Sequence, residues 1–259
     1  MNKLDISLVV CVADDIRIEK FLNSINYYCE IIIVLNGSTN EVRKIVTKFN
    51  NQNKFDLKII EIKEKNLGKA RNLGIVKAKH DKVVFYDSDC IIVGDALKLY
   101  SKYLEKYMLV DGTVKFENNT FQSKIVSIIR SMGIPGYALC PSIGINKKIK
   151  SKINNYFFDK DIKWIEDAEL NQRAKQASIE IGVIKELTCI HDKLTFKQDL
   201  KSAYRYGTGV KIASKKGLLA KRPDANWNLI IPSFKKNFMA GIYCIIWNVI
   251  YCLGYYTKI

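Results

Sequence analysis

Two aspartates, Asp87 and Asp89, stand one residue apart directly after a short apolar run, residues 82–86, whose composition predicts a buried strand. Two carboxylates this close repel each other, so each favours its protonated form unless a cation compensates them. Mg²⁺ and Mn²⁺ bind carboxylate and phosphate oxygens together, so bridging a diphosphate is chemistry that such a pair supports. A solvated acidic turn gives the same pattern, and the pair alone leaves both interpretations open.

Positive charge precedes the acidic turn in the segment 66–89, whose Leu73, Ile75 and Val76 predict the inner face of an amphipathic helix. Lys69 and Arg71 lie in the first half of this segment. The planar guanidinium of arginine suits phosphate and carboxylate groups, so we expect Arg71 to contact a ligand near the aspartates, with Lys69 adding charge. A helix with a purely structural role is the alternative.

Further titratable groups lie downstream. Glu166 and Asp167 begin a predicted helix, residues 166–177, and His191 ends a predicted strand. The helix dipole stabilises acidic residues in a first turn, which explains the pair as capping groups, but it also keeps a carboxylate ionised, as a general base must be. Imidazole suits Mn²⁺ and similar ions, so His191 is a candidate metal ligand, with a structural histidine as the alternative.

The elements that position these groups follow a repeating order in the first third of the chain. Four short runs rich in Ile and Val predict strands buried on both faces: residues 6–12, 30–35, 57–62 and 82–86. Segments with helical spacing separate the first three runs and predict a βαβ series, hence an α/β fold with a doubly wound, mostly parallel sheet. Ligands bind such sheets at the carboxyl ends of the strands, where polar turns follow three of the runs.

The remainder of the chain has a less regular pattern. It predicts a strand over residues 107–116, a helix over 121–129, a turn-rich stretch over 133–146, and a strand pair over 180–191. Seven cysteines are scattered without a C-x-x-C pair, which favours a reducing compartment and no zinc site. The first apolar run is too short for a signal peptide, so we expect a cytoplasmic protein.

The charge balance indicates an anionic partner. The chain of 259 residues has 42 Lys and Arg against 26 Asp and Glu, a formal charge of +16. The excess concentrates in residues 193–237, where eleven basic residues face only Asp199 and Asp224. Phosphorylated ligands or an anionic membrane explain this better than nucleic acid, because no nucleic-acid-binding motif is present.

The C-terminal part predicts a helix unlike the others. Residues 238–256 carry no charge over nineteen positions, include Tyr and Trp, and follow Lys235 and Lys236. This length is borderline for crossing a bilayer, and basic and aromatic flanks are typical of membrane interfaces. We expect contact with an anionic membrane surface, and a helix packed on the main domain is the alternative.

Three stretches, taken in order, carry a family resemblance. "EIIIVLNGST", "NLGKARNLGI…FYDSD" and "FFDKDIKWIEDAEL..R" resemble a family 2 glycosyltransferase with the GT-A fold over roughly residues 5–210. The resemblance implies a mostly parallel, Rossmann-like sheet flanked by helices. It also implies a metal-dependent, hexosyltransferase-type enzyme that uses Mn²⁺ or Mg²⁺ and a nucleotide-diphosphate sugar.

The same resemblance implies roles for individual residues. Asp89 is the expected direct metal ligand with His191, and Asp87 lies nearer the ribose while contributing to the metal site. Arg71 is expected beside the nucleotide sugar. Asp167 is the expected base that activates an acceptor hydroxyl, and the displacement then inverts the anomeric centre.

Glu166, next to the expected base, is expected to bind the acceptor. Two turns depart from the family pattern at the nucleotide-binding edge. The first strand ends in "CVADD" without the usual Pro and Tyr, and the second ends in Leu35-Asn36 where two polar residues are usual. Asn36 and Asp14 remain the expected contacts to the nucleotide, with Lys69 near its phosphates.

Alternatives of other classes stay open at this point. A catalytically degenerate nucleotide-sugar-binding module would explain the altered turns. A metal-dependent phosphohydrolase also places D-x-D at a strand end, but "DSDCII" lacks the turn that usually follows. A nucleotidyltransferase of related fold would need a Gly-rich, Arg-containing N-terminal loop, which is absent.

The expected organisation is a GT-A domain over residues 1–215, followed over 216–259 by a basic linker and an apolar membrane-associating helix. The expected location is cytoplasmic, peripheral or C-terminally anchored at the inner face of the cell membrane. A glycan or lipid-linked saccharide of cell-surface polysaccharide synthesis is then the expected acceptor.

Overall fold

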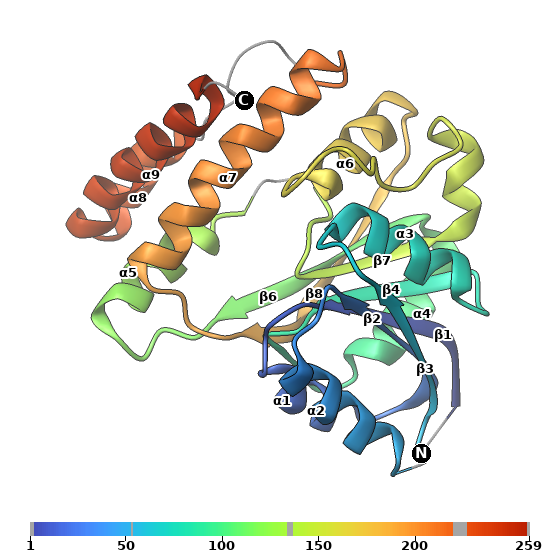
Figure 1. Cartoon of the computed structure of the whole chain (residues 1–259). Helices are drawn as coiled ribbons and strands as arrows, with labels where there is room; N and C mark the ends of the chain where they lie inside the picture. The colour runs from blue at the N-terminus through green and yellow to red at the C-terminus, as the bar shows by residue number, and fades with distance from the viewer. Residues whose placement is uncertain (1–2, 53, 134–136, 220–226, 258–259) are drawn as a thin grey trace.

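The computed structural model describes residues 3–52, 54–133, 137–219 and 227–257. Within them one mixed sheet has the strand order β3-β2-β1-β4-β7-β6-β8-β5 (Figure 1). The strands are β1 (Lys3–Val12), β2 (Tyr28–Asn36), β3 (Asp56–Ile62), β4 (Lys82–Asp87), β5 (Cys90–Ile92), β6 (Leu109–Phe116), β7 (Ser142–Asn146) and β8 (Ile181–His191). Strands β1 to β4 pair in parallel, as do β6 and β8, whereas β4–β7, β6–β7 and β5–β8 are antiparallel.

Helices cover both faces of this sheet. The helices are α1 (Ile18–Asn23), α2 (Asn40–Asn50), α3 (Leu67–Lys77), α4 (Ala96–Lys106), α5 (Phe121–Arg130), α6 (Glu166–Gln176), α7 (Phe196–Lys215), α8 (Ile230–Lys236) and α9 (Phe238–Tyr256), with 3₁₀ turns at Lys147–Lys152 and Trp227–Leu229. Apolar side chains of α1, α2 and α4 pack on one face, and those of α3 and α6 on the other. Side chains alternate along a strand, so β1 contributes Leu8 and Val10 to one core and Val9 to the other.

The four runs of the first third form the predicted parallel strands, and the expected α/β fold with a doubly wound sheet is confirmed. Elsewhere the structure corrects two predictions. Residues 181–191 form one continuous strand, β8, because it pairs with β6 along its length and with β5 at its end. Residues 142–146, expected as part of a turn-rich stretch, form the strand β7 between β4 and β6. The expected turn at residues 134–136 lies outside the described residues.

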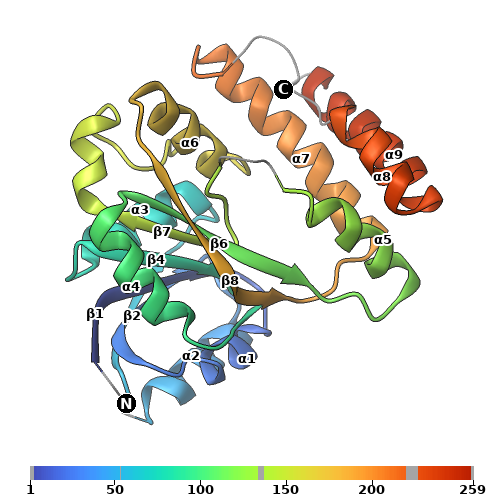
Figure 2. The same cartoon turned by 180° about the vertical axis from the view of Figure 1, so that it is seen from behind.

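Helices α5, α7, α8 and α9 form a separate helical layer beyond the end of β6 (Figures 1 and 2). Helices α7 and α9 lie side by side, and their backbones approach closely at two glycines. A Cβ at Gly207 would lie 2.0 Å from the Tyr251 carbonyl oxygen, and one at Gly254 would lie 2.0 Å from that of Tyr204. Any larger residue at either position would therefore push the two helices apart.

This packing crosses the expected boundary between residues 215 and 216, since α7 precedes it and α9 follows it. The division into a GT-A domain and a C-terminal segment stays a prediction. Part of the expected basic linker, residues 220–226, lies outside the described residues.

Candidate functional site

The D-x-D turn lies between β4 and β5, where the chain leaves one strand and enters the next. The register of β1 with β4 aligns Cys11 with Asp87, so Asp87 stands at the carboxyl end of both strands. The backbone N–H of Asp87 donates to the Pro141 carbonyl at 3.2 Å. Two strand ends and the segment before β7 thus fix the first aspartate.

The second aspartate, Asp89, meets His191 because β5 pairs with β8. Cys90 is opposite His191 in that antiparallel pair, and the Asp192 N–H donates to the Asp89 carbonyl at 3.0 Å. The His191 Nε2 atom consequently lies 3.3 Å from Asp89 Oδ2. Asp89 follows β4 and His191 ends β8. The pairing of β5 with β8 brings the two residues together although they are far apart in the sequence.

The orientation of His191 fits a metal ligand. Its Nδ1 lies 2.6 Å from the Asp192 carbonyl oxygen, which can only accept, so Nδ1 carries the proton. In the neutral ring Nε2 is then a lone-pair atom that faces the carboxylate oxygen of Asp89. In that form the two atoms would be ligands placed to share a divalent cation, since neighbouring ligands of such an ion lie about 3 Å apart.

The protein side chains near this pair do not by themselves complete a metal site. In the described part of the chain, no group of three or more His, Cys, Asp or Glu side chains is placed to hold an ion. Asp89 and His191 fit a divalent ion whose remaining ligands come from phosphate oxygens and water, as Mg²⁺ and Mn²⁺ sites commonly have. Asp87 is turned toward Arg71 instead.

Arg71, on α3, lies at the centre of what we call the Arg71 cluster, namely Arg71, Asp87, Glu166 and Asp167. Its Nη1 donates to Glu166 Oε1 at 2.6 Å, and its Nη2 donates to Asp87 Oδ1 at 3.3 Å. The Arg71 side chain is only 5% exposed. Burial raises the pKa of the Asp87 carboxyl, and the guanidinium opposes that shift. Predicted as a ligand contact, Arg71 is here the link between the D-x-D turn and α6.

Glu166 lies behind Arg71. Its side chain is 1% exposed, and burial raises the pKa of Glu166 to about 7 against the pull of Arg71. Its second oxygen, Oε2, has no hydrogen-bond partner among the described residues. A side chain held this deeply orients the guanidinium. The expected contact between Glu166 and an acceptor stays a prediction.

Asp167 occupies the first turn of α6, and backbone N–H groups hold both of its oxygens. Cys140 N–H donates to Oδ2 at 3.0 Å, and Ala168 N–H donates to Oδ1 at 2.8 Å. Asn171, one turn further along α6, holds the segment before Cys140: it accepts the Ala138 N–H and donates to the Ala138 carbonyl. Burial raises the pKa of Asp167, while Arg71 and the two N–H donors lower it. A carboxylate with a raised pKa is a stronger base for a hydroxyl proton.

Asp87 and Asp167 therefore flank the same dipeptide. Asp87 binds the carbonyl of Pro141 through its backbone, and Asp167 binds the N–H of Cys140 through its carboxylate. The sequence did not single out this dipeptide, because it lies in a stretch expected to be turns. Burial raises the pKa of the Cys140 thiol, so the sulfur beside these carboxylates stays protonated.

The residues expected at the nucleotide-binding edge are tied to other partners. Asn36 is buried, and its Oδ1 accepts the Asn66 N–H at 2.8 Å, which joins the end of β2 to the start of α3. Asp14 pairs with Lys65 at 2.7 Å, and Lys69 pairs with Glu64 at 2.9 Å. Asn36 ends β2, Asp14 follows β1 and Lys69 lies in α3, and none of the three contacts Asp87 or Asp89 among the hydrogen bonds and ion pairs of the described residues.

Arg17, which the sequence analysis missed, holds the metal-facing side together. We call Arg17, Asp15, Asp89, His191 and Asp192 the Arg17 cluster. The Arg17 side chain contacts three carboxylates, which belong to Asp15, Asp89 and Asp192. The spacing Asp15-x-Arg17 was the one sequence signal, and it also fits a simple local ion pair.

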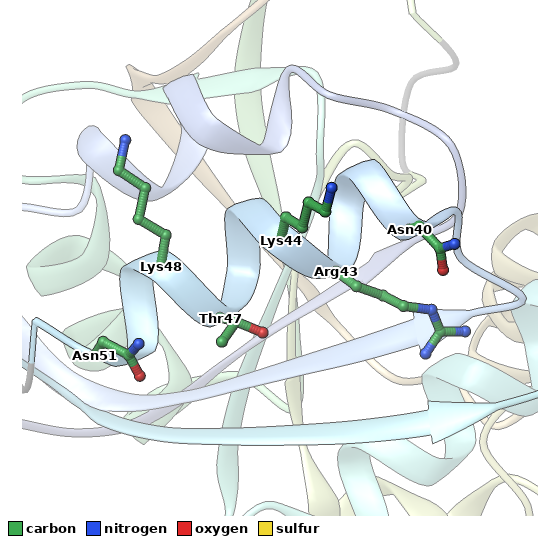
Figure 3. Close-up of a pocket in the computed structure, with 6 residues that line it drawn as sticks. All are labelled: Asn40, Arg43, Lys44, Thr47, Lys48 and Asn51. Carbon is green, nitrogen blue, oxygen red and sulfur yellow. The ribbon is translucent and has the colours of Figure 1, made fainter.

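A shallow, open hollow of about 610 Å³ lies along α2, away from both clusters (Figure 3). Asn40, Arg43, Lys44, Thr47, Lys48 and Asn51 line it. All six belong to one exposed helix face, and Arg43 already pairs with Glu61 on β3. The hollow brings no second element and no acidic or nucleophilic group to a ligand, so we assign it no role.

Comparison with known proteins identifies related chains. The sequence model of Glycosyl transferase family 2 matches residues 15–162, more than half of the chain. An uncharacterized glycosyltransferase of Rickettsia bellii is 30% identical over 121 residues, which cover 46% of this chain and 17% of the relative. The poly(ribitol-phosphate) beta-N-acetylglucosaminyltransferase TarS of Staphylococcus aureus is 25% identical over 187 residues, 68% of this chain. The chain spans about a third of the length of TarS.

Solved structures show the same fold at lower identity. TarS residues 1–349 in complex with UDP superpose with a TM-score of 0.59 and 16% identity, covering 97% of this chain and 90% of that one. The mannosyltransferase PcManGT from Pyrobaculum calidifontis, in complex with GDP-Man and Mn²⁺, gives a TM-score of 0.62 at 13% identity, covering 98% and 74%. The expected GT-A-type α/β fold with a C-terminal apolar helix is confirmed. The chain belongs to glycosyl transferase family 2.

Proposed function

We propose that this protein is an inverting glycosyltransferase that moves a sugar from a nucleotide-diphosphate sugar to an acceptor hydroxyl. The observation that carries the proposal is that Asp87, the proposed donor contact, and Asp167, the proposed base, are connected through shared neighbours. Arg71 joins Asp87, in the D-x-D turn, to the first turn of α6, where Asp167 stands against the same dipeptide as Asp87. Solved relatives bind UDP-GlcNAc and GDP-Man, which supports a donor of this class.

The donor end of the site is proposed at the edge formed by the ends of β1, β2 and β4. Asp87 would contact the ribose, and Asn36, Asp14 and Lys69 border the nucleotide. Asp89 and His191 would hold Mg²⁺ or Mn²⁺ with the diphosphate, and such an ion neutralises the charge that develops on the leaving group. Arg71 stabilises Asp87 as an anion and keeps it oriented.

The acceptor end is proposed at Asp167. Its carboxylate takes the proton from the acceptor hydroxyl, and the oxygen attacks the anomeric carbon from the face opposite the diphosphate. The bond to the diphosphate oxygen breaks as the new glycosidic bond forms, so the anomeric centre inverts. The N–H donors of Cys140 and Ala168 hold the carboxylate in one orientation throughout.

The experiment that tests the donor assignment is a thermal-shift series with UDP- and GDP-sugars, each with and without Mn²⁺. We expect one nucleotide class to raise the melting temperature and Mn²⁺ to enlarge that shift. Stabilisation by none of the donors would favour a degenerate binding module. Stabilisation that does not depend on Mn²⁺ would reject the roles of Asp89 and His191 in metal binding.

We also propose that the enzyme works at the inner face of the cell membrane as a peripheral protein. Helix α9 is the one helix of the described residues that is long and apolar enough to cross a bilayer, yet 44% of its most apolar window is buried in the protein. The packing of α9 on α7 through Gly207 and Gly254 would be lost if α9 spanned the membrane. A helix lying in the membrane plane keeps that packing.

The outer face of the helical layer has the composition that such binding needs. Exposed apolar side chains form one stripe: Ile231 and Phe234 on α8, and Phe238, Met239, Ile245, Ile246, Val249, Leu253 and Tyr256 on α9. In the described part of residues 193–257, Asp199 is the one acidic side chain, and it is buried against Arg130 and Tyr243. An apolar stripe on a basic layer is complementary to a membrane of anionic lipids, because the lipid tails accept the apolar side chains and the headgroups attract the basic ones.

The layer also borders the proposed base. A Cβ at Gly209 of α7 would lie 2.4 Å from the Lys163 carbonyl oxygen, and the Arg205 guanidinium lies 4.1 Å from the centre of the Trp164 ring. Both contacts fall just before Asp167. A membrane-held acceptor, such as a lipid-linked saccharide or a growing surface glycan, would thus reach the base from the bound surface.

Flotation with phosphatidylglycerol and phosphatidylcholine vesicles tests the membrane proposal. We expect the protein to float with the anionic vesicles, less so at high salt, and the variant Ile246→Glu/Val249→Glu to remain in solution. Val76→Glu is the control, since Val76 is 66% exposed, against 44% for Ile246 and for Val249, but lies on α3. Equal flotation of the stripe variant, or a stripe-dependent dimer in place of flotation, would overturn the proposal.

A further inference from the structure

Arg17 stands just before α1 and uses its guanidinium as a fork. Nε and Nη2 each donate to one oxygen of Asp15 at 2.8 Å, and Nη1 donates to Asp192 Oδ2 at 2.7 Å. A second contact of Nη2 reaches Asp89 Oδ2 at 3.1 Å. Three turns, which follow β1, β4 and β8, are thereby joined by one cation.

The oxygen that Arg17 contacts on Asp89 is the one that faces His191. Asp89 Oδ2 lies 3.1 Å from Arg17 Nη2 and 3.3 Å from His191 Nε2. An ion held between Asp89 and His191 would need this same oxygen and would lie close to the positive charge of Arg17. Like charges at such short range repel, so both cannot occupy this oxygen in their best positions.

The Arg17 side chain is 31% exposed, so water reaches its surroundings. Its Nη1 is bound to Asp192 and its Nη2 to Asp89, and an incoming anion could take over either contact while the bidentate pair with Asp15 stays in place. A guanidinium in contact with water loses little when it exchanges one partner for another. A diphosphate bound beside Asp89 would provide that partner.

We propose that Arg17 is an internal counter-cation of the metal-facing carboxylate. It occupies Asp89 Oδ2 when no donor is bound, and it transfers this contact to the donor diphosphate when a divalent ion takes the oxygen. The transfer of the contact rests on the proposed function, whereas the occupation of Asp89 does not. Asp15 is the pivot that keeps Arg17 at the site in both arrangements.

This exchange couples the metal to the diphosphate. The ion alone must displace Arg17 without offering it another anion, so it binds weakly. With a diphosphate present, Arg17 has a new partner, and each ligand then strengthens the binding of the other by the same factor. Without the guanidinium, Asp15, Asp89 and Asp192 would attract an ion more strongly, and the coupling would shrink.

Titration of free Mn²⁺, followed by its electron paramagnetic resonance signal, tests the proposal on the full chain. Wild type, Arg17→Gln, Arg17→Lys and the control Arg43→Gln are each titrated alone and with saturating UDP or GDP. Arg17→Gln should bind Mn²⁺ alone about tenfold more tightly than wild type, and its nucleotide-dependent gain should fall toward one. Arg17→Lys keeps the charge and should bind Mn²⁺ alone as weakly as wild type, and Arg43→Gln should match wild type throughout.

The opposite result has a clear meaning. If Arg17 only braces the three turns, Arg17→Gln and Arg17→Lys will both bind Mn²⁺ more weakly than wild type or equally well, and the proposal fails. It also fails if no variant binds Mn²⁺. Should neither nucleotide bind to wild type in the presence of Mn²⁺, the donor assignment and the transfer to diphosphate fail, while the Mn²⁺-alone comparison still decides whether Arg17 occupies Asp89.

Discussion

The two sides of the D-x-D turn are each organised by an arginine, but in different surroundings. Arg71 holds Asp87 and Glu166 with a side chain that is 5% exposed, whereas Arg17 holds Asp15, Asp89 and Asp192 with one that is 31% exposed. Both are positive charges among carboxylates. They differ in the free energy that is lost when one of their carboxylate partners is left unpaired.

That difference separates a fixed support from an exchangeable contact. Breaking a buried ion pair leaves a charge without water or partner, which is strongly unfavourable. Breaking a pair in contact with solvent costs little, because water replaces the lost partner. Arg71 therefore holds Asp87 and Glu166 in one arrangement, and Arg17 is the arginine that we expect to move when ligands arrive.

The largest effect should come from Asp167, the proposed base, in the Arg71 cluster. Asp167→Asn keeps the shape and one of the two backbone contacts, because the amide has a single acceptor oxygen, and it removes the proton acceptor, so transfer should fall about 10²- to 10⁴-fold. Nucleotide and Mn²⁺ binding, measured by calorimetry, should stay within about twofold of wild type, a difference of well under about 1.4 kcal/mol in binding free energy. A comparable loss of nucleotide binding would show that Asp167 supports the donor site instead of the chemistry.

Removal of Arg71 should have the next largest effect, on folding. Arg71→Met leaves Glu166 buried without its cation, and we expect the free energy of unfolding to drop by about 3–5 kcal/mol in urea denaturation. Arg71→Met/Glu166→Gln removes both charges and should recover part of this loss. If the double variant is no more stable than the single one, the charge of Glu166 is not what Arg71 compensates.

The sequence predicted the parts of this comparison unequally. Asp87, Asp89, Asp167 and His191 were found because each lies at the end of an apolar run or the start of a periodic helix, where local patterns are strong. Their mutual contacts then follow from strand order. Arg17 and the Cys140–Pro141 dipeptide were missed because their importance arises from pairing between distant strands, β5 with β8 and β4 with β7.

The fold shows the same division. The ends of the first four strands were predicted to within three residues, since buried parallel strands are uninterrupted apolar runs. Strand β5 has three residues, too few for any periodicity, and β8 changes partners along its length. The packing of α9 on α7 depends on glycines whose close approach is visible only once both helices are placed.

A buried carboxylate without an arginine provides a contrast to both clusters. Asp111, on β6, has no ion pair among the described residues, and burial raises its pKa from 3.8 to about 7, opposed by the Leu139 N–H. The folded state thus favours the protonated form. The stability that this provides is complete below about pH 4 and is lost as the pH rises toward 7, by at most about 1.4 kcal/mol per pH unit.

Asp111→Asn should flatten this dependence, because the amide stays neutral at every pH. Urea denaturation at intervals between pH 4 and 7.5 measures the difference between the variant and wild type. We expect the variant to gain stability relative to wild type steadily across this range. A constant difference between the two proteins would mean that Asp111 is ionised in the folded state and that burial alone does not control it.

The smallest effect should come from the arginine that lies outside both clusters. Arg43, on α2 (Figure 3), forms an ion pair with Glu61, and the two side chains are 33% and 44% exposed. Exposed pairs contribute little, because solvent and salt screen them. Arg43→Gln should therefore leave the urea midpoint, the transfer rate and Mn²⁺ binding at their wild-type values. A change in the urea midpoint as large as that of Arg71→Met, or in Mn²⁺ binding as large as that of Arg17→Gln, would mean that loss of positive charge anywhere on this basic protein accounts for those effects. The distinction between a buried support and an exchangeable contact would then have to be abandoned.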